Sequence, residues 1–235
     1  MDRNLEVLSN NLANVSTPGF KASRPVFETV LAKRVAVDGE GAEGAPQPLG
    51  ERRDVTIADV GADLSQGALV ETANDLDIAI SGDGWIGIQS AGGQRFTRRG
   101  SMHLDAERRL TIGGAPIRAE GGGDLVIPEE SYIVVDPDGS VYANENLVGR
   151  MEILKFNDPD ALQPVGGGFF EGNAAQAEPA EEAEVLQGYL ENSNVNPVWG
   201  MTELIRTTRI FEAAQKVITA YKEMDDKLAR EIGRI

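Results

Sequence analysis

The chain has 235 residues, of which 41 % are hydrophobic and 26 % charged, a composition typical of a folded protein with one large core or two smaller ones. Its formal net charge of -16 argues against binding nucleic acid or an anionic membrane surface through a basic patch. Cysteine is absent, which excludes disulfides, thiolate metal ligands and cysteine nucleophiles, and no apolar run reaches the ~18 residues of a membrane span.

The first predicted element is a short amphipathic helix over residues 2–16. Pro18 and Gly19 end it, because proline disfavours the α conformation in the residue before it and glycine accepts the positive φ of a type II turn. The apolar residues of this helix recur at spacings of three and four: Leu5, Leu8, Leu12 and Val15. These features predict an N-terminal helical segment over residues 1–35, in which a second short amphipathic stretch covers Pro25–Arg34.

Residues 36–54, which are rich in Gly, Pro and Glu, are predicted to be a linker. From Val55 to Phe156, short β-branched runs such as DLDIAI, GWIGIQ, YIVV and SVYA alternate with turn sequences such as SGDG and DPDGS. This spacing predicts a mostly antiparallel central β domain over residues 55–165. The Gly-rich and then Ala- and Glu-rich residues 166–187 are predicted to be a second linker that leads back to the helical part.

The last segment, residues 188–235, is predicted to contain the long C-terminal helix of the stem, which runs from Pro197 to Ile235. Pro197 suits its first turn, with Asn196 as the N-cap. At ~1.5 Å per residue the helix is about 55 Å long, more than a small β domain can cover, so we expect a helical partner. Its apolar residues recur at threes and fours: Met201, Leu204, Ile205, Thr208, Phe211, Ala214, Val217, Ile218, Tyr221, Met224, Leu228 and Ile232. The predicted fold is therefore α+β, with terminal helices that pair as a coiled-coil-like stem.

No pattern in the sequence predicts catalysis. The only histidine, His103, lies in a strand-like run without an identifiable orienting partner. DPDG at 136–139 and GDG at 82–84 are interpreted as hairpin turns, since the first lacks the remaining ligands of a calcium loop. The Gly-rich segments lack the features of phosphate-binding loops, and adjacent glutamates are interpreted as solvated charge. We predict no catalytic, cofactor-binding or metal-binding residues and no cofactor.

Four stretches, in chain order, resemble the flagellar axial proteins of bacteria, the rod and hook family. They are LSNNLANVSTPGFKASR (8–24), LSQGALVETANDLDIAISGDGWIGI (64–88), RFTRRGSMHLDAERRLTIGGAPI (95–117) and GYLENSNVNPVWGMTELIRTTRIFEAAQKVI (188–218). The first and last are similar to the family's terminal motifs, and the two between them to its β module. The sequence NPVWGMTELIRTTRIFE is most similar to that of proximal rod members, and distal rod members come next.

The resemblance implies a structural, self-assembling subunit of the flagellar basal-body rod, the hollow shaft that crosses the periplasm. Its implied partners are proximal and distal rod subunits, other copies of itself and the flagellar type III export apparatus, which exports such subunits without cleaving a signal peptide. Together with the apolar stripes it gives a predicted assembly interface: Leu5, Leu8, Asn11, Leu12, Asn14, Val15, Gly19, Phe20, Asn194, Val195, Met201, Ile205, Arg209, Phe211, Glu212, Ile218, Tyr221 and Leu228. For Asn10, Asn11 and Asn14, backbone capping and an intersubunit contact remain open alternatives.

Members of that family usually have a longer helix before the Asn-Asn-Leu motif. Here residues 2–16 span about 22 Å of helix against about 55 Å at the other end, so we expect that roughly fifteen to twenty residues precede Met1. Two other functional classes are alternatives: a secreted β-domain binding module with helical oligomerisation ends, and a hydrolase built around His103.

Overall fold

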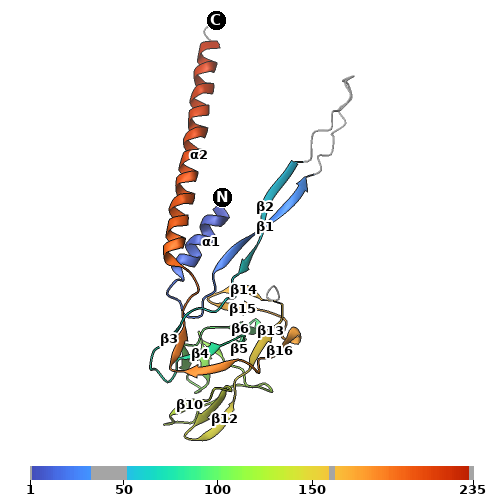
Figure 1. The fold of residues 1–235 in the computed structure, drawn as a ribbon, viewed down its shortest axis with the longest axis vertical. Coiled ribbons are helices and arrows are strands. Elements are labelled where there is room, and N and C mark those ends of the chain that lie inside the picture. Colours follow the sequence, from blue (N-terminus) through green and yellow to red (C-terminus); the bar gives the residue numbers. More distant parts are fainter. Residues whose placement is uncertain (1, 33–51, 159–161, 233–235) are drawn as a thin grey trace.

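The computed structural model describes residues 2–32, 52–158 and 162–232. Two α-helices, α1 (Asp2–Ala13) and α2 (Pro197–Ile232), lie at one end of the molecule, and mostly antiparallel β structure forms the other (Figure 1). The predicted α+β class is therefore confirmed. We call the two helices the stem and residues 69–191 the β module. Neither helix in the described parts of the chain is long and apolar enough to cross a membrane.

Local sequence explains where both helices end or begin. Helix α1 stops at Ala13, so Val15 lies in a turn in which the amide of Thr17 donates to the carbonyl of Asn14 at 3.1 Å. Helix α2 begins at Pro197, and the amide of Trp199 donates to Oδ1 of Asn196 at 3.1 Å. This contact confirms Asn196 as the N-cap. Helix α2 has 36 residues, a length of about 54 Å at 1.5 Å per residue.

A two-stranded antiparallel ribbon replaces the predicted second amphipathic stretch. Strand β1 (Ser23–Ala32) pairs along its length with β2 (Arg52–Ala62), and the register shifts between Val26 and Phe27. The prediction for Pro25–Arg34 was wrong because spacing alone does not separate a short helix from a strand whose partner lies far along the chain. The ribbon rises on the side of the molecule that carries the stem (Figure 1). Residues 33–35 of the predicted N-terminal segment and 36–51 of the predicted linker lie outside the described residues, and 52–54 belong to β2.

The largest sheet of the β module has the strand order β14-β15-β6-β5-β13-β16. Two three-stranded sheets, β7-β8-β9 and β10-β11-β12, and two strand pairs, β17-β4 and β18-β3, complete it, and the sheet β10-β11-β12 lies farthest from the stem (Figure 1). The strands are β3 (Leu69–Glu71), β4 (Ile78–Ser81), β5 (Trp85–Ser90), β6 (Gly93–Thr97), β7 (Met102–Leu104), β8 (Leu110–Ile112), β9 (Ala115–Pro116), β10 (Ile133–Val135), β11 (Ser140–Ala143), β12 (Asn146–Arg150), β13 (Ile153–Phe156), β14 (Gln163–Gly166), β15 (Phe169–Glu171), β16 (Ala177–Pro179), β17 (Glu184–Gln187) and β18 (Tyr189–Glu191).

The predicted second linker, residues 166–187, is instead part of the β module. It contains β15, β16 and β17, and β17 pairs with β4 while the following β18 pairs with β3. The glycines at 166–168 all have positive φ and form the turn between β14 and β15. A glycine run at a hairpin has the same composition as a flexible linker, which is why composition misled the prediction. This pairing brings the chain back beneath the stem.

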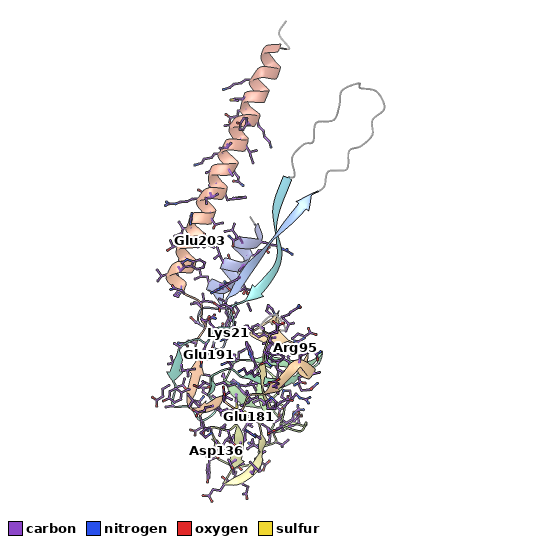
Figure 2. The ribbon with its side chains drawn as sticks, turned by 45° about the vertical axis from the view of Figure 1, so that its right-hand side comes forward. Lys21, Arg95, Asp136, Glu181, Glu191 and Glu203 are labelled. Atoms are coloured by element: carbon purple, nitrogen blue, oxygen red, sulfur yellow. The ribbon has the colours of Figure 1, made fainter. Side chains whose placement is uncertain are left out.

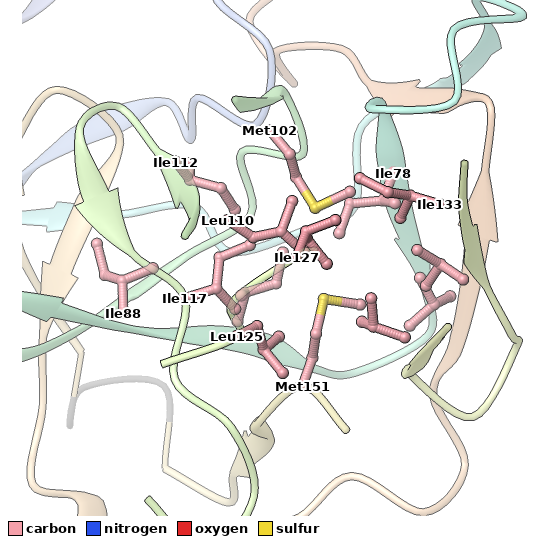
Figure 3. Packing of buried hydrophobic residues seen from close by; sticks show 14 of the residues in the cluster. Ile78, Ile88, Met102, Leu110, Ile112, Ile117, Leu125, Ile127, Ile133 and Met151 are labelled. Carbon is pink, nitrogen blue, oxygen red and sulfur yellow. The ribbon is translucent and has the colours of Figure 1, made fainter. Parts of the chain in front are cut away.

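The core consists mainly of Ile side chains, with fewer Val and Leu, between the sheets, and Figure 3 shows Met102 and Met151 among them. Leu110, Ile112 and Ile117 have no exposed surface. A second cluster lies on the other side of the large sheet, where the rings of Trp85 and Phe170 meet edge-on with centroids 4.9 Å apart. These two clusters make the β module a rigid base for the stem.

Candidate assembly interface

Helix α1 packs its apolar side against the first turns of α2. Val7 and Leu8 are buried, and Leu5 and Leu12 are half-buried. The residues of α2 that are buried or half-buried mark the face turned toward α1: Gly200, Glu203, Leu204, Thr207 and Phe211. Their spacing of three and four is that of one helix face, so the contact reaches only about three turns along α2.

Beyond Phe211, α2 has no cover from the described residues of its own chain. Every residue from Glu212 through Met224 is exposed, and α2 extends well past the end of α1 (Figure 1). Large apolar side chains lie in this part of the helix. We define the seam as the positions that recur at alternating steps of four and three: Ile210, Ala214, Val217, Tyr221, Met224 and Leu228. Such a seven-residue repeat is the pattern of a helix that packs against another helix.

The predicted interface residues of α2 divide into two groups. Phe211 is half-buried on the face turned toward α1. The side chains of Met201 and Ile205 are 52 % and 54 % exposed, so the structure does not bring them into the contact with α1. Arg209, Glu212, Ile218 and Tyr221 are also exposed, and Leu228 lies farther along the same helix.

Asn11 connects α1 to the ribbon. Its Nδ2 donates to the carbonyl of Ser23 at 2.8 Å, and its Oδ1 accepts from the amide of Ser23 at 2.8 Å. Asn14 contacts its own turn, since its Nδ2 donates to the carbonyl of Asn10 at 2.9 Å and its Oδ1 accepts from the hydroxyl of Thr17 at 3.2 Å. Both side chains therefore make bonds within the chain.

Asn194 performs a similar role where the chain enters α2. Its Oδ1 accepts from the amide of Ala22 at 2.7 Å, and its Nδ2 donates to the carbonyls of Asp63 and Ser65 at 2.8 and 3.0 Å. Its backbone amide donates to the carbonyl of Phe20, which is buried, at 3.4 Å. Val195 beside it is half-buried. The structure thus assembles the predicted residues at 19–20 and 194–195 into one junction.

The turn after α1 lies directly on the β module. Gly19 has φ +68°, and a Cβ placed there would lie 2.4 Å from the backbone carbon of Arg98. Its amide donates to the carbonyl of Glu191 at 2.7 Å. Only glycine permits both the positive φ and this close approach of two backbones. The Pro18–Gly19 turn therefore seats the N-terminal segment on the β module.

A buried ion cluster at this junction was not predicted from the sequence. Glu191 lies between Lys21, with Nζ 2.6 Å from Oε1, and Arg98, with Nη1 3.4 Å from Oε2. Burial lowers the pKa of Lys21 and of Arg98, although the charge of Glu191 acts to raise both. A local sequence signal could not have revealed the cluster, because Lys21 and Glu191 are 170 positions apart.

The described residues show no arrangement for catalysis or metal binding. They contain no group of three or more His, Asp or Glu residues placed to hold a metal ion. His103 is exposed on β7, and its carbonyl accepts a hydrogen bond from Thr111 at 3.0 Å. Residues 136–139 form the predicted turn, in which the amide of Gly139 donates to the carbonyl of Asp136 at 2.9 Å.

Three family models match the chain in order. The flagella basal body rod protein model matches residues 1–21, the flagellar hook protein FlgE/F/G D1 domain matches residues 79–143, and the flagellar basal body rod FlgEFG protein C-terminal model matches residues 186–231. The first match covers α1 and the turn that follows it, and the second covers part of the β module. The third covers β18 and nearly all of α2.

Comparison with curated proteins covers nearly the whole chain. It is 34 % identical to the flagellar basal-body rod protein FlgF of Salmonella typhimurium over 94 % of this chain and 89 % of that protein. It is 32 % identical to FlgF of Caulobacter vibrioides, over 99 % and 93 %, and 30 % identical to the rod protein FlgG of Agrobacterium fabrum, over 97 % and 94 %. The chain belongs to the flagellar basal-body rod protein family and is a structural rod subunit, not an enzyme.

Proposed function

We propose that this subunit assembles through its stem, with the seam of α2 packed against helices of neighbouring rod subunits as a coiled-coil-like wall. The observation that carries the proposal is the seven-residue repeat on α2, which remains exposed from Glu212 through Met224. Val217, Tyr221 and Met224 are each more than half exposed. Helices in proteins gain most of their stability from packing of an apolar face, so this part of α2 needs a partner.

Apolar burial supplies the driving force for this packing. Complete burial of one large aliphatic side chain stabilises by about 1.5–3 kcal/mol. Several such side chains per subunit, repeated along a polymer, are sufficient to hold α2 in place against the repulsion between copies that each carry a formal net charge of -16. In this arrangement the β module, at the other end of the molecule (Figure 1), lies outside the helical wall.

We further propose that the subunit occupies the proximal rod. The support is its similarity to four FlgF proteins at 30–34 % identity, against 29–31 % for four FlgG proteins. Distal position is the alternative; the comparisons do not favour a secreted binding module. Export through the flagellar type III apparatus without a cleaved signal belongs to the same proposal. Restored swimming in a strain that lacks FlgF, but not in one that lacks FlgG, would support the proximal position.

The assembly proposal is tested by making the seam polar in a strain that lacks the native subunit. The variant carries Ile210→Ser, Val217→Ser, Tyr221→Ser and Met224→Ser, and we expect loss of swimming with an unchanged thermal midpoint of the β module. A matched control replaces two exposed polar residues of the same helix, Gln215→Ser and Lys222→Ser, and should swim. Normal swimming by the seam variant would overturn the proposal.

A further inference from the structure

Three segments that are far apart in the sequence meet in the ion cluster, defined as Lys21, Arg98 and Glu191. Lys21 follows the turn after α1, Arg98 follows β6 in the β module, and Glu191 ends β18 just before the chain enters α2. Figure 2 shows Lys21 and Glu191 together at the narrow junction between the stem and the β module. The ion cluster is therefore the place where the segment after α1 and the segment before α2 are both attached to the β module.

Glu191 uses both of its oxygens to join these segments. Oε1 accepts from Nζ of Lys21 at 2.6 Å and from the amide of Gly67 at 2.8 Å, and Oε2 accepts from Nη1 of Arg98 at 3.4 Å. The side chains of Lys21, Glu191 and Arg98 are 0 %, 1 % and 3 % exposed. Few other charged groups in the described residues are buried so completely.

Lys21 and Arg98 also donate hydrogen bonds to backbone carbonyls. Nζ of Lys21 donates to the carbonyl of Ser65 at 2.7 Å. Nη2 of Arg98 donates to the carbonyl of Gly82 at 2.7 Å, and its guanidinium lies 5.3 Å from the ring centroid of Trp85. Arg98 is thus fixed to the core of the β module, and Glu191 and then Lys21 are positioned from it.

The backbone around the cluster leaves no room for adjustment. A Cβ at Gly67 would lie 1.9 Å from the carbonyl oxygen of Asn192, as a Cβ at Gly19 would lie 2.4 Å from the backbone of Arg98. A shift of either stem segment would therefore break contacts on both sides of Glu191. Close packing therefore resists small, continuous changes in the angle of the junction.

A buried ion cluster is a poor source of stability, because removing the charges from water costs about as much as their attraction returns. It is specific in geometry, however, since a partly satisfied cluster leaves a buried charge without its counter-charge. We propose that Glu191 is the positioning residue that holds the N-terminal and C-terminal segments of the stem on the β module in a single orientation.

This orientation is a property of the single chain. Its consequence in the rod rests on the proposed function: a fixed junction makes the stem and the β module turn as one body, so that torque passes between the helical wall and the outer module. A hydrophobic junction of equal volume would attach the same segments without fixing their angle.

The test measures distances between spin labels on the free chain. Because the chain has no cysteine, Ser9→Cys on α1 with His103→Cys on β7, and Lys216→Cys on α2 with His103→Cys, give two clean label pairs at exposed positions. The labelled chains carry the four serine substitutions in the seam, and the distances are measured on the fraction that size-exclusion chromatography shows to be monomeric. We expect a single narrow distance maximum for each pair when the ion cluster is intact.

The decisive variant replaces the whole cluster with apolar residues, Lys21→Met, Arg98→Met and Glu191→Leu. We expect it to fold, with native circular dichroism, and to lose the narrow maximum for both label pairs. A folded variant that keeps both narrow maxima overturns the proposal. If this variant does not fold, Lys21→Met alone decides in the same way through the α1 pair.

A matched control neutralises a half-buried ion pair in the β module. Asp105→Asn removes the negative charge of the carboxylate that lies 2.7 Å from Nε of Arg109, and both maxima should remain narrow. Because the distances are measured on monomers, they are independent of rod assembly. Normal swimming by the seam variant would contradict the assembly proposal but not the positioning role of Glu191. Narrow maxima in the apolar variant would contradict the positioning role but not the assembly proposal.

Discussion

The side-chain amide of Asn11 and the backbone of Ser23 form a closed pair of hydrogen bonds, both 2.8 Å long. Asn11 lies in α1 and Ser23 begins β1, so this pair ties the helix to the base of the ribbon. The side chain of Asn11 imitates the donor and acceptor that a neighbouring strand would offer. An asparagine in the last turn of α1 thus has a defined structural role.

We expect Asn11→Ala to weaken the attachment of α1 by about 1–3 kcal/mol, because the amide and carbonyl of Ser23 lose their partners in a part-buried site. The measurement is hydrogen exchange of the α1 amides under native conditions. Asn10→Ala, at an exposed position of the same helix, is the control and should change the opening free energy by less than about 0.5 kcal/mol. Equal effects of the two substitutions would contradict this role for Asn11.

Gly19 is expected to tolerate no side chain. Gly19→Ala combines a positive φ with a contact of 2.4 Å to the backbone of Arg98, whereas Gly114→Ala at φ +83° has no atom within 4 Å of the added Cβ. The strain of the left-handed conformation alone costs about 1–2 kcal/mol. We expect Gly19→Ala to lose a further ~1–3 kcal/mol through overpacking. Urea denaturation of both variants measures the difference, and equal losses would disprove the contact.

The ion cluster predicts a dependence of stability on alkaline pH. Burial, opposed by the charge of Glu191, lowers the pKa of Lys21 below 10.5 in the folded chain. The unfolded chain therefore binds more protons between the folded pKa and 10.5, so the contribution of Lys21 to the free energy of unfolding rises with pH across that window and is lost as pH falls through the folded pKa.

Urea denaturation as a function of pH measures this effect. Lys21→Met should remove the rise, and Lys155→Met, on the half-exposed strand β13, should retain it. Parallel pH profiles for the original chain and for Lys21→Met would show that Lys21 does not titrate differently in the two states.

His103→Ala should leave swimming unchanged. The side chain is exposed on β7, and the hydrogen bond from Thr111 goes to the backbone carbonyl, which alanine keeps. The expected change in stability is within about 0.5 kcal/mol. A swimming assay in a strain that lacks the native subunit tests this, and loss of motility by a folded His103→Ala chain would reopen a chemical role for this residue.

Local signals predicted the parts of the fold that local chemistry determines. Asn196 and Pro197 marked the start of α2 through an N-cap and a fixed φ, and the DPDG sequence predicted its turn through the preferences of Asp and Gly. The apolar repeat predicted α2 itself. In each case the residues that decide the structure are within a few positions of one another.

The features that were missed depend on contacts between distant segments. β1 was interpreted as a helix because its partner β2 lies beyond residues 33–51, and β17 was assigned to a linker because its partner β4 lies about a hundred positions earlier. The ion cluster depends on three such segments at once. The face of α2 that packs against α1 also differs from the predicted apolar stripe. Gly200 and Thr207 belong to this face, and neither was in the stripe.

Helix α2 should show two levels of protection from hydrogen exchange in the free chain. Its first turns pack against α1 as far as Phe211, and the residues from Glu212 through Met224 are exposed. Amides in the first part are expected to exchange slowly and those in the second part rapidly, because a helix without tertiary packing is marginal in water. Mass spectrometry of peptides from the two halves provides the measurement.

Deletion of residues 1–13 supplies the control within the same helix. Without α1, exchange should accelerate at 200–211 and remain unchanged at 212–224, because only the first group loses a packing partner. Acceleration along the whole of α2 would mean that α1 stabilises the helix through propagation, and slow exchange at 212–224 in the free chain would mean that the seam is already covered. Assembly into the rod should then slow exchange selectively at the seam, which is the part that the single chain leaves open.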